Sequence, residues 1–465
     1  MVFSSLTFLC IFLPAVLILD RLFKNIHIKN ALLLVASLLF YAYGEPVFVL
    51  LMTESALLNY LMARLIDRFN NNLKLKKTFL TLGVIINLGL LVFFKYSAFL
   101  IISINNTLSA SIPVPDVTLP LGISFFTFQA MSYVIDVYRG DCGVQKNFGR
   151  LLLYISFFPQ LIAGPIVKYR DIEEQILNRT VTSDKTALGI RRFAQGLAKK
   201  VFIANNVAVI ADTVFNSVLT NLDAKTAWLG AVAYMLQIFF DFSGYSDMAI
   251  GLGKMFGFEF KENFDHPYVA DSIKDFWRRW HISLSTWFKE YLYIPLGGNR
   301  KGKARTIINK YIVFACTGIW HGANWTFLFW GLYHGCFLMI EEFIPKKEKK
   351  GIVLKILSHI YLVFVVMIGF VMFRCESISD FGVMVTRMFM LGSISESSIM
   401  FMKLITPLNL TAIVAGIVFS MPVGRFVKDC KATRALSYVA ALAAVVLAVM
   451  CLSSGSYNPF IYFRF

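Results

Sequence analysis

Residues 78–102, TFLTLGVIINLGLLVFFKYSAFLII, decide the class of fold. Lys95 is the one charged side chain in this run, and the rest is almost entirely apolar. A helix of about 20 apolar residues is long enough to cross the hydrocarbon core of a bilayer. A lysine near the end of such a helix can extend its ammonium group to the interface. The run therefore predicts a transmembrane helix.

Similar runs recur along the chain. Of its 465 residues, 57% are hydrophobic and 16% are charged, and the mean hydropathy is +0.65; soluble domains contain about 25% charged residues. We predict an all-α polytopic membrane protein that forms one integral membrane domain over residues 1–465. We expect about eleven or twelve transmembrane helices, with re-entrant or interfacial helices besides. The expected spans are 2–20, 30–43, 47–65, 78–102, 119–137, 200–217, 226–252, 307–321, 323–343, 356–373, 406–423 and 436–453.

Two segments do not fit a plain span. Residues 151–167 contain Pro159, Gly164 and Pro165, which predict a broken, re-entrant piece covered by protein or water. Residues 272–295 mix tryptophan with lysine and arginine, a pattern typical of an amphipathic helix at the membrane interface.

The basic residues predict an orientation. Lysine and arginine follow the first and third spans, whereas the turn 44–46 and the loop 103–117 contain neither. The positive-inside rule then places the N-terminus outside the cell and the basic loops in the cytoplasm. The net charge of +17 reflects this topology, so we expect membrane lipids, and no nucleic acid, around the chain.

The segment 320–335, WHGANWTFLFWGLYHG, carries two histidines. Ionisable groups inside a membrane are costly and usually mark a working site. We place the chemistry on His321, because Gly322 beside it is expected to leave room for a substrate. If one helix continued to His334, the two rings would differ by about 220° and about 20 Å along the axis, so only one could be the central catalyst. A hydrogen-bonded packing role is the alternative for either histidine.

Two basic segments are candidates for binding anionic headgroups or a phosphate-bearing cofactor. The first, 276–288, reads FWRRWHISLSTWF and contains Arg278, Arg279 and His281; a structural role at the interface is the alternative. The second, 297–305, reads GGNRKGKAR, and a solvated cytoplasmic turn is its alternative. Its candidate donor ligands are Asn299, Arg300, Lys301 and Lys303.

Other chemistries find little support. Asp241 and Asp247 interrupt an apolar span, but six residues apart they lie on different faces of a helix. We therefore expect them to act as caps or to pair with arginine or lysine. The seven cysteines are scattered without a C-x-x-C pair, and we expect no metal. The chain has no P-loop, G-x-S-x-G or H-E-x-x-H motif, which disfavours an ATPase, serine hydrolase or metalloprotease.

Several motifs, taken in order, resemble the membrane-bound O-acyltransferase family, and within it the bacterial branch that modifies alginate, peptidoglycan and teichoic acid. They lie at Pro120–Gln129, Phe157–Pro165, Phe276–Ser285, Tyr291–Asn299, Trp320–Trp325 and Asn458–Phe465. The resemblance covers a core of about 40–335, followed by further spans in 356–453. It implies a helical bundle around a central tunnel in the bacterial cytoplasmic (inner) membrane. It also implies that His321 is the catalytic histidine and His281 the second motif histidine.

We therefore predict an O-acyltransferase that moves an acyl group, most readily acetyl, from a cytoplasmic thioester to a cell-surface polysaccharide or a partner transferase. The donor would be acetyl-CoA or another acyl thioester, with an acyl carrier protein as an alternative source. His321 would act as general base or carry the acyl group transiently. The chain has no sugar-binding domain, which favours an extracytoplasmic partner acetyltransferase. The alternatives are D-alanyl transfer to teichoic acids and, in a different class, a polysaccharide export channel or transporter.

Overall fold

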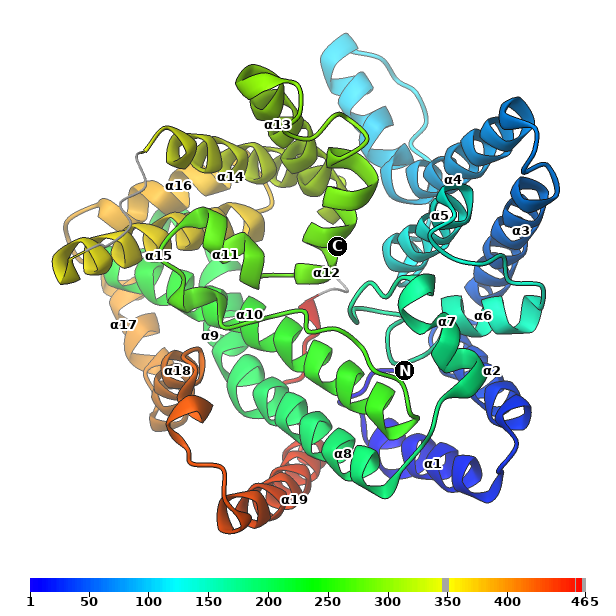
Figure 1. The fold of residues 1–465 in the computed structure, drawn as a ribbon. Coiled ribbons are helices and arrows are strands. Elements are labelled where there is room, and N and C mark those ends of the chain that lie inside the picture. The colour runs from blue at the N-terminus through cyan, green and yellow to red at the C-terminus, as the bar shows by residue number, and fades with distance from the viewer. Residues whose placement is uncertain (345–350, 456, 462–465) are drawn as a thin grey trace. The chain divides into compact units, whose positions relative to one another are not determined.

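A computed structural model describes residues 1–344, 351–455 and 457–461. All secondary structure in these ranges is helical, which confirms the all-α class (Figure 1). The chain forms two compact units, one of residues 1–193 and 246–261 and the other of residues 194–245 and 262–465. The single membrane domain expected over 1–465 stays a prediction.

The first unit holds the N-terminal helices, and α8 and α10 have residues in both units. Its elements are η1 (Thr7–Phe12), α1 (Leu13–Leu22), α2 (Ile26–Ala42), α3 (Phe48–Arg68), α4 (Leu73–Leu108), α5 (Ile123–Arg139), α6 (Phe148–Ser156), α7 (Tyr169–Asn178), α8 (Ser183–Ala198) and the end of α10 (Ala224–Met255).

The second unit holds both sequence-predicted histidines and begins in α8. Besides most of α10, its elements are η2 (Lys199–Ala204), α9 (Asn205–Phe215), η3 (Leu219–Asn221), η4 (Pro267–Val269), α11 (Ile273–Arg279), α12 (Ile282–Phe288), η5 (Lys289–Tyr293), α13 (Gly302–His321), α14 (Trp325–Phe343), α15 (Ile352–Arg374), α16 (Ile378–Phe389), α17 (Ser395–Leu404), α18 (Pro407–Phe419), η6 (Val423–Phe426) and α19 (Lys431–Ser453).

Four of the described helices, α3, α4, α15 and α19, are long and apolar enough to cross a membrane. The bent pair α17 and α18 would make a fifth span if it crosses as one. The predicted run 78–102 lies inside α4, which extends beyond it in both directions through the more polar stretches 73–77 and 103–108. A polytopic membrane fold is therefore confirmed, while the count of eleven or twelve spans stays a prediction. Residues 462–465 of the terminal motif lie outside the described residues.

The predicted broken segment is irregular, as expected. Helix α6 ends at Ser156, and the backbone that follows runs through turns while remaining buried to Lys168. A Cβ atom at Gly164 would lie 2.5 Å from the Cα atom of Gln160, so only glycine fits this turn. Because protein covers the segment, its irregular backbone is shielded from lipid.

The interfacial segment differs from the single amphipathic helix expected for 272–295. It forms the three short pieces α11, α12 and η5. His281 has a φ angle of +45° between the first two, a left-handed conformation that ends one helix and starts the next.

The hairpin of α13 and α14 positions His321. The two helices pack side by side (Figure 1), with Gly318 facing Gly331. A Cβ atom at Gly318 would lie 2.3 Å from the carbonyl oxygen of Phe327, so the helices approach closely only because this residue is glycine. The Asn324 side chain caps α14 by accepting from the backbone N–H of Thr326. The sequence therefore builds a tight hairpin with His321 at its turn.

Candidate active site

His321 ends α13 inside a cage of aromatic rings. Its side chain lies in the core, and the residue is 7% exposed. The rings of Trp320, Trp330 and Phe373 each stand 5.1 Å from the imidazole, steeply inclined to it. These contacts fix the imidazole in a water-poor environment.

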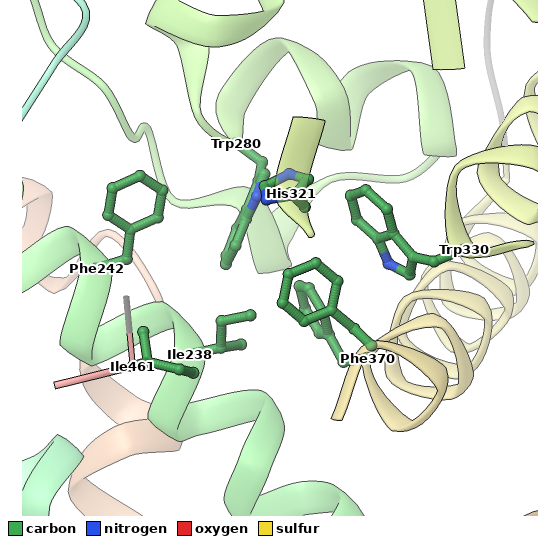
Figure 2. A pocket seen from close by; sticks show the side chains of 8 residues that line it. Ile238, Phe242, Trp280, His321, Trp330, Phe370 and Ile461 are labelled. Carbon is green, nitrogen blue, oxygen red and sulfur yellow. The ribbon is translucent and has the colours of Figure 1, made fainter. Parts of the chain in front are cut away.

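A small cavity opens beside the imidazole (Figure 2). Its volume is about 20 Å³, room for about one water-sized group. Apart from the histidine, its walls are hydrocarbon and aromatic side chains. The lining residues are Ile238, Phe242, Trp280, His321, Trp330, Phe370, Phe373 and Ile461. The cavity leaves free space beside the His321 imidazole, while a central tunnel that joins both membrane faces stays a prediction.

Gly322 does not provide that space, contrary to the sequence-based expectation. A Cβ atom there would lie 2.1 Å from the ring of Phe327, so the ring occupies the room that the missing side chain leaves. Phe327 in turn packs on Phe373, with ring centres 4.8 Å apart. The glycine therefore serves the packing around His321, and the cavity lies elsewhere around the imidazole.

His281 is buried with one nitrogen directed at an acceptor. Its Nδ1 lies 3.3 Å from Oδ1 of Asn263, which also accepts from the backbone N–H of Ser283 at 3.1 Å. Because that N–H identifies the Asn263 atom as oxygen, Nδ1 of His281 must carry the proton. Nε2 then offers a lone pair and has no hydrogen-bond partner among the described residues.

The environment of His281 keeps it uncharged. The residue is 1% exposed, and burial lowers its pKa from 6.5 to about 3. Its ring packs edge-on against Phe242 at 4.6 Å and lies 6.2 Å from Trp320. His281 thus contacts Phe242, which lines the cavity beside His321, and its imidazole is uncharged.

His334 and His321 contact the same tryptophan, which they could not do if one continuous helix joined them. The chain breaks between α13 and α14, so the rotation calculated for one helix does not apply. Trp330 lies 5.1 Å from the imidazole rings of both His321 and His334. Both nitrogens of His334 lack a hydrogen-bond partner among the described residues. The two histidines flank one indole ring.

A second, open pocket lies along the first half of α13. Its volume is about 360 Å³, and lysines from three elements reach it. The lining residues are Lys274, Ser285, Lys289, Tyr293, Asn299, Thr306, Lys310, Val313 and Glu342. Lys310 also forms an ion pair with Glu342. Such a pocket attracts anions because its positive groups outnumber its negative one.

The structure brings one of the six predicted donor ligands, Asn299, into this pocket. Arg279 instead pairs with Asp275 at 2.8 Å and Asp265 at 3.5 Å, which joins α11 to the loop before it. The others are exposed outside its lining: Arg278, Arg300, Lys301 and Lys303. The lysines that do line the pocket were missed because Lys274, Lys289 and Lys310 come from separate helical pieces. A signal for two of them was present in the mixed aromatic and basic stretch 272–295.

Asp241 and Asp247 are each paired with a basic side chain, one of the two roles expected from the sequence. Asp241 binds Lys200 at 2.8 Å, and Asp247 binds Arg192 at 2.7 Å. Both aspartates are buried, and the pairs join different helices. A catalytic pair of carboxylates is therefore not formed by these residues.

Comparison with known proteins identifies the family. The model of the membrane-bound O-acyltransferase family matches residues 143–379, about half of the chain. The chain belongs to this family. It is therefore an O-acyltransferase and a multi-pass membrane protein, as predicted from the sequence. The matched region contains both His281 and His321.

Three relatives show the breadth of the similarity. A probable alginate O-acetylase of Pseudomonas putida is 39% identical over the full length of both chains. A peptidoglycan O-acetyltransferase of Helicobacter pylori is 37% identical, covering 82% of this chain and 78% of that protein. A teichoic acid D-alanyltransferase of Bacillus subtilis is 31% identical, covering 50% of this chain and 60% of that protein. The similarity to the two O-acetylating proteins extends over far more of the chain.

Proposed function

We propose that this O-acyltransferase moves an acetyl group from a cytoplasmic thioester to an extracytoplasmic acceptor, with His321 as the catalytic base. The observation that carries the proposal is the imidazole of His321 at the wall of a small apolar cavity. A dry, preformed site of this kind holds the reacting groups in place and excludes water that would hydrolyse the thioester. The full-length similarity to an alginate O-acetylase supports the same assignment.

The chemistry needs one proton acceptor. His321 takes the proton of the acceptor hydroxyl as its oxygen attacks the thioester carbonyl, the C–S bond breaks, and the leaving thiolate takes the proton back. Neutral imidazole suits this exchange at cellular pH, and general base catalysis contributes about 10²–10⁴-fold. In the covalent alternative the imidazole itself attacks the carbonyl and passes the acyl group on. The buried, neutral His281 supports the arrangement from behind Phe242.

The cavity favours acetyl over D-alanyl. A D-alanyl group carries an ammonium, and an ammonium in hydrocarbon surroundings is strongly disfavoured unless a partner satisfies it. The cavity walls beside His321 are aliphatic and aromatic, and the volume of the cavity suits a methyl-sized group. An uncharged two-carbon acyl group meets both conditions.

The open lysine pocket is proposed as the site for the donor phosphates. Lys310 lies eleven residues before His321 on α13, which is about 16 Å along the helix axis. A phosphate bound in the pocket would leave a flexible pantetheine arm to extend along this helix. Acetyl-CoA and an acyl carrier protein both carry such a group. Exposed residues around the pocket complete the proposed basic surface: Arg278, Arg300, Lys301 and Lys303.

The proposed setting is the cytoplasmic membrane of a bacterium, with the N-terminus outside. The basic loop 297–305 then faces the cytoplasm, where thioester donors are made. The acceptor is a cell-surface polysaccharide hydroxyl, reached directly or through an extracytoplasmic partner acetyltransferase. Membership of a family of acyltransferases disfavours the alternative function as a polysaccharide export channel.

The test uses the full-length protein in liposomes, with acetyl-CoA and a D-alanyl carrier protein supplied in turn. Transfer of labelled acetyl to a polysaccharide acceptor is expected, and His321→Ala is expected to abolish it. His27→Ala is the matched control, because His27 is an exposed histidine of the first unit. In cells, mass spectrometry of the surface polymers should show that O-acetyl groups disappear in His321→Ala while polymer export continues. Acetyl transfer that persists in His321→Ala, or a preference for D-alanine, would contradict the proposal.

A further inference from the structure

The last described residues form a strap that enters the core of the second unit. The strap, Tyr457–Ile461, is drawn in red beside α10 in Figure 1. The backbone N–H of Ile461 donates to Oδ2 of Asp241 at 2.8 Å, and the ammonium of Lys200 donates to the carbonyl of Pro459. The Tyr457 hydroxyl donates to Asp212 at 2.7 Å. The strap is thus tied down at both of its ends.

Lys200 and Asp241 form a buried ion pair that also binds the strap. They lie 2.8 Å apart, with side chains that are 3% and 1% exposed. A buried ion pair is stable only when further hydrogen bonds satisfy its remaining groups. Here the strap backbone supplies those bonds to both partners. The pair and the strap therefore stabilise each other.

The end of the strap forms part of the His321 cavity. Figure 2 shows Ile461 beside Ile238, across the cavity from His321. Most of the other wall residues are aromatic side chains held by α10, α14 and α15. Ile461 is different because the strap, held through Asp241, presents it. A change in the strap would move this part of the wall and little else.

We propose that Ile461 limits the transferred acyl group to two carbons, and that Asp241 and Lys200 hold Ile461 in position. This inference rests on the proposed function. The cavity has room for about one methyl-sized group, so each further methylene must displace the wall. Ile461 is thus a specificity-determining residue, and Asp241 and Lys200 are positioning residues.

The test measures competition between acetyl and propionyl thioesters, read as the propionyl-to-acetyl ratio in the product. Ile461→Ala enlarges the cavity and is expected to raise the ratio about 10- to 200-fold, the range for a methylene in an apolar pocket. Ile461→Val removes one methylene and should raise the ratio by less than Ile461→Ala does, toward the lower end of the same range. Ile413→Ala is the matched control, because Ile413 is a buried isoleucine of α18 outside the cavity lining and should leave the ratio unchanged.

A second arm tests the positioning pair. Asp241→Asn removes the charge and should raise the ratio as the strap loosens. The double variant with Lys200→Met removes the unpaired ammonium as well, so it should recover thermal stability while the ratio stays high. A structural role alone would change stability and leave the ratio at the wild-type value.

The outcomes separate the two proposals. An unchanged ratio in Ile461→Ala, with acetyl transfer intact, would overturn this inference and leave the proposed function standing. If the alanine variant does not fold, Ile461→Val decides in the same way. Absence of acetyl transfer by the wild-type protein would instead refute the proposed function itself.

Discussion

The two ends of α13 differ in every property that matters for catalysis. Its first half lines an open pocket of about 360 Å³ that three lysines from different helical pieces reach. Its last residue, His321, lines an apolar cavity of about 20 Å³. Near water each lysine interacts weakly with an anion, because solvent screens the charges. In the dry cavity the same interactions are much stronger. In the proposed function, α13 thus separates recognition of a charged carrier from chemistry on an uncharged group.

The largest expected effect comes from the imidazole. His321→Gln should lower kcat by about 10²–10⁴-fold, because an amide of similar size cannot take up the proton. The dissociation constant of acetyl-CoA should stay the same, since the phosphates bind at the other end of α13. Steady-state kinetics and equilibrium binding check both values. A large loss of donor affinity would show that the two ends are not independent.

The next largest effect tests the close packing of α13 against α14. Gly318→Val should destabilise the protein by about 1–3 kcal/mol or more, because its Cβ would overlap the carbonyl oxygen of Phe327. Thermal unfolding in detergent measures the change. Gly382→Ala is the control, since open space surrounds that glycine in α16, and its stability should match or exceed that of the wild type. Equal stability of the two variants would contradict the close packing of α13 and α14.

The pH dependence of stability tests whether His281 is buried in its uncharged form. The pKa of His281 is about 3 in the folded protein and near 6.5 when unfolded, so the unfolded state binds the extra proton more readily between these values. Stability should therefore fall as the pH drops below about 6.5, by up to about tenfold per pH unit in the folding equilibrium from this group. His281→Gln should lose less stability than the wild type between pH 6.5 and 5. Parallel losses in both proteins would mean that His281 is not buried as a neutral base.

The smallest effect belongs to the open pocket. Lys289→Gln should raise the KM for acetyl-CoA about two- to fivefold and leave kcat unchanged, as expected for one solvent-screened charge contact. The effect should shrink at high salt. Lys403→Gln is the control, because Lys403 is exposed at the end of α17, away from the pocket. A fall in kcat without a change in KM would place Lys289 in the chemical step instead.

The sequence predicted contacts that depend on local pattern, whereas the structure alone shows those that depend on how the helices assemble. The ion pairs of Asp241 and Asp247 followed from the cost of an isolated charge in an apolar span, and both are present. The candidate donor ligands were assigned to the segment 276–288 and the loop 297–305, and of these Asn299 lines the open pocket. The pocket lysines lie on separate short helices, and sequence spacing does not report their meeting.

The sequence by itself determined the helical membrane class, because long apolar runs can satisfy their backbone in a bilayer only as helices. It also led to the prediction, still to be tested, that His321 and His281 have chemical roles. Only the tertiary structure decided that Phe327 fills the space at Gly322, that Asn263 fixes the tautomer of His281, and that Ile461 faces His321 across the cavity. Helix formation depends on residues a few positions apart, whereas these contacts join residues far apart in the chain. Their geometry follows from how the helices pack, which the order of residues alone does not reveal.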